Sequence, residues 1–87
     1  MATLIILHQV ANYDDWRRVY DVKSSIADAH GRESARVFRN TDDPNEVAVV
    51  ETFGEAERIR DLVGSPELAA AMKTAGVVGS PTIHVID

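Results

Sequence analysis

The first apolar stretch of the chain, residues 4–10, is nearly continuous rather than alternating. It starts with Leu4, Ile5 and Ile6, which favour β structure. A strand without strict alternation is typical of one that is covered on both faces. Helices in so short a chain can cover only one face of a sheet, so we expect another layer of protein over the second face.

Helical periodicity follows this strand. Asn12 is a suitable N-cap, and two aspartates in the next turn suit the positive end of the helix dipole. Trp16 and Tyr20 begin an apolar stripe at helical spacing. Gly31 tolerates the left-handed conformation that often ends a helix. The pattern therefore predicts one helix over residues 13–30.

Two strands, residues 34–39 and 46–53, flank a segment that is dense in turn-forming residues, so they are predicted to form a hairpin. Thr52 and Glu55 have the spacing of a capping box for a short helix that Gly64 interrupts.

The rest of the chain predicts another helix and a last strand. Ser65 and Pro66 fit the N-cap and first turn of the helix. The Gly-Ser-Pro segment at residues 79–81 predicts a break, and residues 82–86 form the strand.

The resulting order, βαββααβ, predicts an α+β, ferredoxin-like fold with a four-stranded antiparallel sheet. Right-handed crossovers place the first and third strands in the centre and the helices on one face. Leucine, isoleucine and valine occupy both parities of three strands, so the open face is expected to be apolar as well. A bare apolar sheet of this size predicts a homodimer.

Composition narrows the possible functions. The 87 residues suffice for a single domain, residues 1–87, and the absence of cysteine excludes disulfides and thiolate metal sites. A net charge of −5 argues against nucleic-acid or anionic-membrane partners. There is no signal-peptide pattern and no run of the roughly 20 apolar residues that a membrane span requires, so we expect a cytoplasmic protein.

Two histidines on neighbouring strands are candidates for chemistry. His8 interrupts an apolar run, which favours it as a general base, and His84 is expected to bind substrate if the strand register places both on one face. The alternative is a half-buried strand histidine that is satisfied by backbone or solvent. His30 is better explained as the last residue of its helix. No histidine pair has metal-ligand spacing, so no metal site is predicted.

Glu51 is an acid in a strand of apolar residues. Alternation places it on the same face as Val47 and Val49, where desolvation would raise the pKa of a carboxyl group, as a general base requires. The alternative places Glu51 at the end of the strand, facing solvent or paired with Arg36 or Arg39.

Aromatic residues of the first helix could line a ligand site. Trp16 and Tyr20, together with Tyr13, have the spacing of core residues but would equally form the walls of a cavity over the sheet. Arg36 and Arg39 could clamp an anionic ligand, although hairpin arginines are usually solvated.

Together these segments resemble the dimeric α/β-barrel superfamily, and within it small proteins of the antibiotic biosynthesis monooxygenase type and related cyclases. The resemblance extends over residues 4–86 and is carried by the segments at residues 8–10, 12–16, 37–39, 42–45, 49–53, 65–68, 71–72 and 75–77. Many monooxygenase-type members carry histidine where this chain has residues 59–62, Ile-Arg-Asp-Leu, which weighs against a haem-type or standard oxygenase role.

The resemblance implies a dimeric α/β barrel with a pocket between sheet and helices in each protomer. It implies an enzyme without metal or organic cofactor, acting by acid–base chemistry on an apolar substrate such as a polyketide or an aromatic compound. His8 and Glu51 are its candidate catalytic residues, and Trp16, Tyr20 and His84 its candidate substrate-binding residues. The alternative is a non-catalytic homodimer that binds a metabolite or responds to stress.

Overall fold

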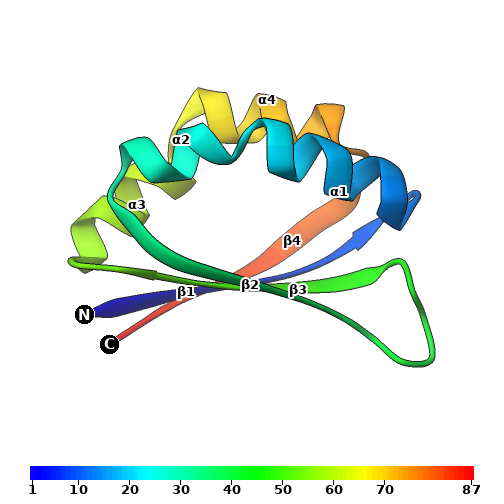
Figure 1. The fold of residues 1–87 in the computed structure, drawn as a ribbon, viewed down its shortest axis with the longest axis horizontal. Coiled ribbons are helices and arrows are strands. Elements are labelled where there is room, and N and C mark those ends of the chain that lie inside the picture. The colour runs from blue at the N-terminus through cyan, green and yellow to red at the C-terminus, as the bar shows by residue number, and fades with distance from the viewer.

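The computed structural model describes residues 1–87 as one four-stranded sheet with four helices (Figure 1). The elements are, in chain order, β1 (Ala2–Val10), α1 (Tyr13–Val22), α2 (Ser24–Ala29), β2 (Arg32–Arg39), β3 (Glu46–Phe53), α3 (Ala56–Val63), α4 (Pro66–Thr74) and β4 (Val77–Ile86). The sheet order is β2-β3-β1-β4, and all three neighbouring pairs are antiparallel. The predicted α+β, ferredoxin-like fold, with β1 and β3 in the centre, is confirmed.

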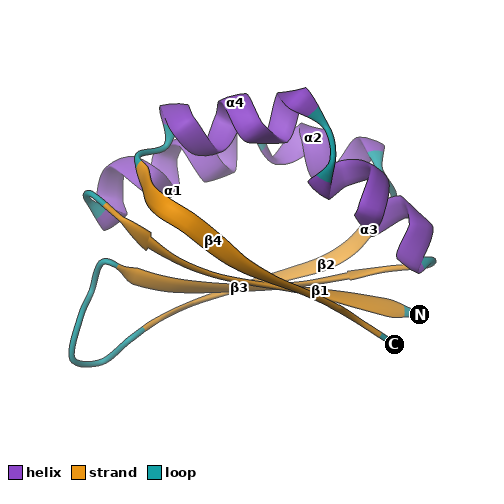
Figure 2. Ribbon diagram, turned by 180° about the vertical axis from the view of Figure 1, so that it is seen from behind, coloured by secondary structure: helices purple, strands orange, loops and turns teal.

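All four helices lie on one face of the sheet, as Figures 1 and 2 show from opposite sides. Alternation along β1 and β3 turns every second side chain towards them, and these side chains are buried. They form the core together with residues of the helices above. Its largest fully buried members are Leu4, Val10, Val47, Val49, Phe53, Ile59 and Leu62.

The other face of the sheet is uncovered in the protomer, and large apolar side chains lie on it. Leu7 and Phe38 are each 44% exposed, Val78 is 53% exposed and Ile86 is 48% exposed. Ala48 of β3 pairs with Leu7 of β1 on one side and with Phe38 of β2 on the other. These three residues form an apolar row across the three strands. The predicted apolar character is thus found in part, because Gln9, Arg36, Thr82 and His84 lie on the same face.

The first helix differs from its prediction, because it is interrupted at Lys23 and divided into α1 and α2. The hydroxyl of Ser24 donates to the carbonyl oxygen of Asp21 (2.9 Å), a local bond that competes with regular helical pairing. The predicted capping box is also wrong. Thr52 is part of β3 and bonds Ser34, while the N-cap of α3 is Glu55, without a side-chain cap.

The predicted break at residues 79–81 is a bulge inside one continuous strand, β4. Leu7 pairs with Thr82 but Gln9 pairs with Val78, so a single residue of β1 between these pairs lies opposite three residues of β4. Gly79, with φ of +71°, supplies the left-handed conformation at this bulge.

The other predicted caps are confirmed. Asn12 accepts a hydrogen bond from the backbone N–H of Asp15 (3.0 Å), and Ser65 accepts one from that of Leu68 (3.2 Å). No helix is long and apolar enough to cross a membrane.

Candidate functional site

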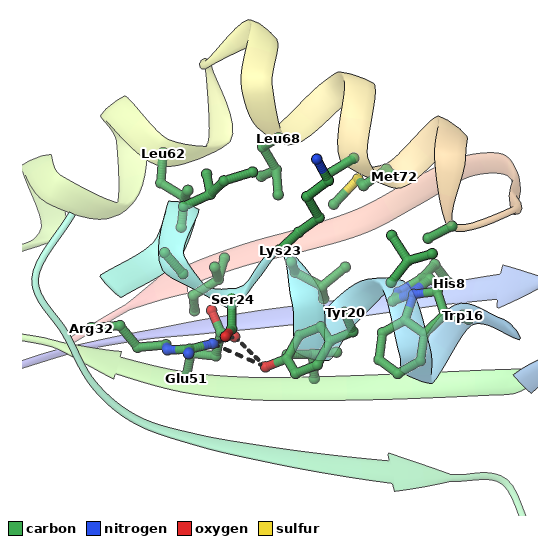
Figure 3. A pocket seen from close by; sticks show the side chains of 18 residues that line it. His8, Trp16, Tyr20, Lys23, Ser24, Arg32, Glu51, Leu62, Leu68 and Met72 are labelled. Atoms are coloured by element: carbon green, nitrogen blue, oxygen red, sulfur yellow. Dashed lines mark hydrogen bonds and ion pairs between the residues drawn. The ribbon is translucent and has the colours of Figure 1, made fainter. Parts of the chain in front are cut away.

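A cavity lies between the sheet and the four helices, and we call it the inner cavity (Figure 3). Its volume is about 70 Å³, and 13 of the 18 residues that line it are hydrophobic. Leu4, Ile6 and Val49 of the sheet contribute to its floor, while Leu68 and Met72 of α4 contribute to its roof. The polar residues in the lining are His8, Tyr20, Lys23, Ser24, Arg32 and Glu51.

His8 lies at one end of the inner cavity, beside Trp16 (Figure 3). It faces the helices because it alternates with Ile6 and Val10 along β1, and only 7% of its surface is exposed. Both ring nitrogens are buried without a hydrogen-bond partner. Since most buried polar groups are paired, two free nitrogens on a cavity wall are the pattern expected where a ligand is to be bound.

Burial also decides the charge of His8. Desolvation lowers its pKa from the ordinary value, because the charged form loses its hydration without gaining a partner. The imidazole is therefore neutral at pH 7 and able to accept a proton. The β4 bulge lies opposite it, so His8 has no direct pairing partner on that strand.

Glu51, Arg32 and Tyr20 meet at the other end of the cavity, as the dashed lines in Figure 3 show. The hydroxyl of Tyr20 donates to Oε2 of Glu51 (2.5 Å), and Nη1 of Arg32 donates to the same oxygen (2.9 Å). Nη1 of Arg32 is also 3.3 Å from the hydroxyl oxygen of Tyr20. Asp28 holds the far side of the guanidinium, with Nη2 at 2.9 Å. We call the first three residues the carboxylate network.

The ion pair within this network is nearly dry. The side chain of Glu51 is 4% exposed and that of Arg32 is 12% exposed. Burial would lower the pKa of Arg32, but the hydrogen bond and charge of Glu51, together with Tyr20 and Asp28, outweigh it and raise that pKa. Burial, followed by the hydrogen bond and charge of Glu51, raises the pKa of Tyr20. Tyr20 thus keeps its proton and directs it at Glu51.

The aromatic residues of α1 form a wall of the cavity. Trp16 is buried and stacks on Tyr20 with ring centroids 4.9 Å apart, and the ring of His8 is 5.4 Å from that of Trp16. Tyr13 packs against Trp16 outside the lining. The structure therefore brings His8, Glu51, Trp16 and Tyr20 to one cavity, as sequence reasoning grouped them.

His84 does not lie at this cavity. It pairs with Ile5, whose side chain is on the opposite face of the sheet from His8, and it is exposed there. His30 lies at the end of α2, with Nδ1 2.9 Å from the carbonyl oxygen of Ile26. No group of three or more histidine, aspartate or glutamate side chains is placed to hold a metal ion.

Arg32 lines the cavity but is not among the residues predicted from the sequence. It lies two residues before the strand predicted from Ser34, and the expected partners of Glu51 were Arg36 and Arg39. Arg36 pairs with Val50 on the open face and lies over Phe38, whereas Arg39 lies over the ring of Tyr13. The available signal was Glu51 itself, since a carboxylate among buried apolar residues needs a cation nearby.

Searches of sequence and structure give different results. No protein-family model matches the sequence, and no curated protein matches it. The fold, in contrast, matches many solved structures. An antibiotic biosynthesis monooxygenase superposes with a TM-score of 0.76 at 12% identity, covering 100% of this chain and 97% of the other.

Two further structures agree. A variant of SnoaB, a cofactor-independent oxygenase from Streptomyces nogalater, gives a TM-score of 0.78 at 11% identity, covering 99% of this chain and 90% of SnoaB. A protein from Bordetella bronchiseptica, assigned as a putative antibiotic biosynthesis monooxygenase, gives a TM-score of 0.81 at 14% identity. The match covers 99% of this chain and 94% of the Bordetella protein. The chain has the antibiotic biosynthesis monooxygenase fold. Identities this low establish the fold and leave the chemistry to be argued from the site.

Proposed function

We propose that the chain is a homodimeric small-molecule enzyme of the antibiotic biosynthesis monooxygenase and cyclase type. It acts by acid–base chemistry without a cofactor, on an apolar substrate such as a polyketide or an aromatic compound. The observation that carries this proposal is His8, a buried imidazole on an apolar cavity wall whose two nitrogens have no partner in the protein.

His8 is the general base of the proposed reaction. Because its lowered pKa leaves it neutral at pH 7, it can remove a proton from an acidic C–H or a phenol of the bound substrate. The resulting anion can close a ring, isomerise or react with dioxygen. The apolar surroundings keep water from competing for the proton.

The carboxylate network has a positioning role in this proposal. Glu51 already accepts hydrogen bonds from Arg32 and Tyr20. We therefore propose that Glu51 holds these two side chains in place and does not act as a base. The single proton of Tyr20 is directed at Glu51, so Tyr20 offers the substrate a hydrogen-bond acceptor. Trp16 and Tyr20 supply the flat wall against which a ring would stack.

The size of the inner cavity limits how a substrate is bound. A cavity of 150 Å³ is known to hold benzene, about twice the 70 Å³ found here. A ring must therefore displace side chains of the roof. The flexible side chain of Met72 and the exposed Lys23, which reaches across towards α4 in Figure 3, are placed to yield.

Hydrogen exchange at carbon tests the proposed proton transfer directly. Phenylacetone, which has a single ring, carries an acidic methylene between the ring and its carbonyl group, and exchange of this methylene in D₂O is followed by proton NMR. The wild-type chain is expected to accelerate exchange, and His8→Gln is expected to reduce the acceleration about 100-fold or more. Since the base acts in its neutral form, the rate should persist below the ordinary histidine pKa of about 6.5 and fall only at lower pH.

His84→Gln is the matched control, because it removes a histidine from the opposite face of the sheet, and its exchange rate should equal that of the wild type. Equal rates in His8→Gln and the wild type would rule out His8 as the base. The non-catalytic alternative predicts that phenylacetone binds without any accelerated exchange.

A further inference from the structure

A second hollow lies on the other flank of α4, between that helix and β4, and we call it the outer groove. Its volume is about 370 Å³. Lys73 is its one charged lining residue, so it suits an apolar occupant. The apolar lining comes mainly from Val63, Leu68, Met72, Val77, Pro81 and Ile83.

The outer groove and the inner cavity lie side by side on the helix-covered face of the sheet. Leu68 and Met72 are the two residues that line both of them. Ile6 lines the inner cavity and Ile83 lines the outer groove, and these two residues are direct partners in the pairing of β1 with β4. The two spaces thus have adjoining floors and a common roof helix, and the side chains of Leu68 and Met72 separate them.

This partition is easy to move. Helix α4 has no buried residue, whereas α3 buries Ile59 and Leu62. Leu68 and Met72 are only partly buried, and methionine has three rotatable side-chain bonds and adapts to irregular spaces. Displacing these two side chains therefore disturbs the core less than displacing a fully buried residue such as Leu4.

The two spaces also differ in chemistry. The inner cavity offers the free nitrogens of His8 and the carboxylate network, which suit a small polar head. The outer groove offers mostly hydrocarbon.

We propose that the two spaces form one site for an elongated ligand. Its polar head lies against His8, and its unbranched apolar tail passes under α4 between Leu68 and Met72 into the outer groove. This inference rests on the proposed small-molecule site at His8 and adds the class of ligand that the site takes.

A series of 4-alkylphenols, from phenol to 4-heptylphenol, tests the tail. Trp16 is the only tryptophan of the chain and lines the inner cavity, so its fluorescence reports occupation by the phenol head. Affinity is expected to rise by up to about fourfold for each methylene that enters the groove. Ala69→Phe, at an exposed position that lines the outer groove alone, should fill it.

Ala69→Phe is therefore expected to weaken binding of 4-heptylphenol at least tenfold and to leave phenol binding unchanged. Ala70→Phe is the control, because Ala70 is exposed on the same helix and lines neither space, and it should bind the whole series like the wild type.

Three results would overturn the inference. If phenol binds at Trp16 but affinity does not depend on chain length, the proposed function survives and the tail site does not. If affinity rises equally in Ala69→Phe and Ala70→Phe, the tail lies elsewhere. If no phenol of the series changes the fluorescence of Trp16, both the inference and the small-molecule site at His8 fail.

Discussion

Glu51 is an acid at a position where alternation along β3 places side chains in the core, and Arg32 makes that position tolerable. Transfer of an isolated carboxylate out of water costs several kcal/mol, and the paired guanidinium offsets this only while both partners are present. The buried Arg32–Glu51 ion pair therefore fixes the positions of these side chains and adds little net stability. It also fixes the hydroxyl of Tyr20 at the cavity wall.

Removing Arg32 should expose this dependence. Arg32→Met leaves a buried carboxylate without its cation, and the free energy of unfolding is expected to fall by about 3–5 kcal/mol. The double variant Arg32→Met/Glu51→Gln should recover most of the loss, because no charge is left buried. Urea denaturation at pH 7 measures both. Arg18→Met breaks an exposed pair with Asp15 and should cost under about 1 kcal/mol, so an equal loss in both single variants would contradict the argument.

At the scale of elements, the strands and their order could be predicted because alternation and turn-forming residues are local signals. Residues 46–53 have the predicted bounds, and the central place of β1 and β3 follows from right-handed crossovers. The division of the first helix at Lys23 could not be predicted, because neither glycine nor proline marks this position in the sequence.

Register explains what the sequence leaves open at the site. Four of the candidate site residues line the cavity, namely His8, Glu51, Trp16 and Tyr20. The face of His84 depends on pairing across a bulge, which no local pattern determines. Arg32 reaches Glu51 across a register shift between Arg32 and Ser34, so spacing along the chain does not indicate that pair.

The β4 bulge should require glycine at position 79, because the backbone there is left-handed. The space around Gly79 is open, but its φ of +71° is unfavourable for residues with a Cβ, so Gly79→Ala is expected to cost about 1–2 kcal/mol of unfolding free energy. Gly54→Ala is the control, since Gly54 has open space without a positive φ and should lose little or gain slightly. Equal stabilities of the two variants by urea denaturation would show that the bulge is not constrained.

At the scale of the whole molecule, the sheet has helices on one face only. The open face carries Leu7, Phe38, Val78 and Ile86 at exposures of 44% to 53%. We propose that this face is buried against a second copy of the chain in the homodimer. Stable interfaces bury about 800 Å² on each partner.

Leu7→Glu should convert the proposed dimer into monomers. The charge lies on an already exposed position in the protomer, so folding is little affected, whereas burial in an interface becomes costly. Light scattering at micromolar concentration should give about twice the 9.5 kDa chain mass for the wild type and the chain mass for the variant. Val22→Glu, at a 76% exposed apolar position on α1, should remain dimeric. A wild-type particle of chain mass would contradict the homodimer.

Helix α4 roofs the inner cavity without placing a buried residue in the core. Replacements along it are therefore expected to change the shape of the cavity at less cost to folding than replacements of the fully buried residues of the sheet. In the proposed site, the roof therefore sets the ligand preference, while the fully buried core comes mainly from the sheet and from α3. New specificities can arise in the roof by single substitutions, with little risk to folding.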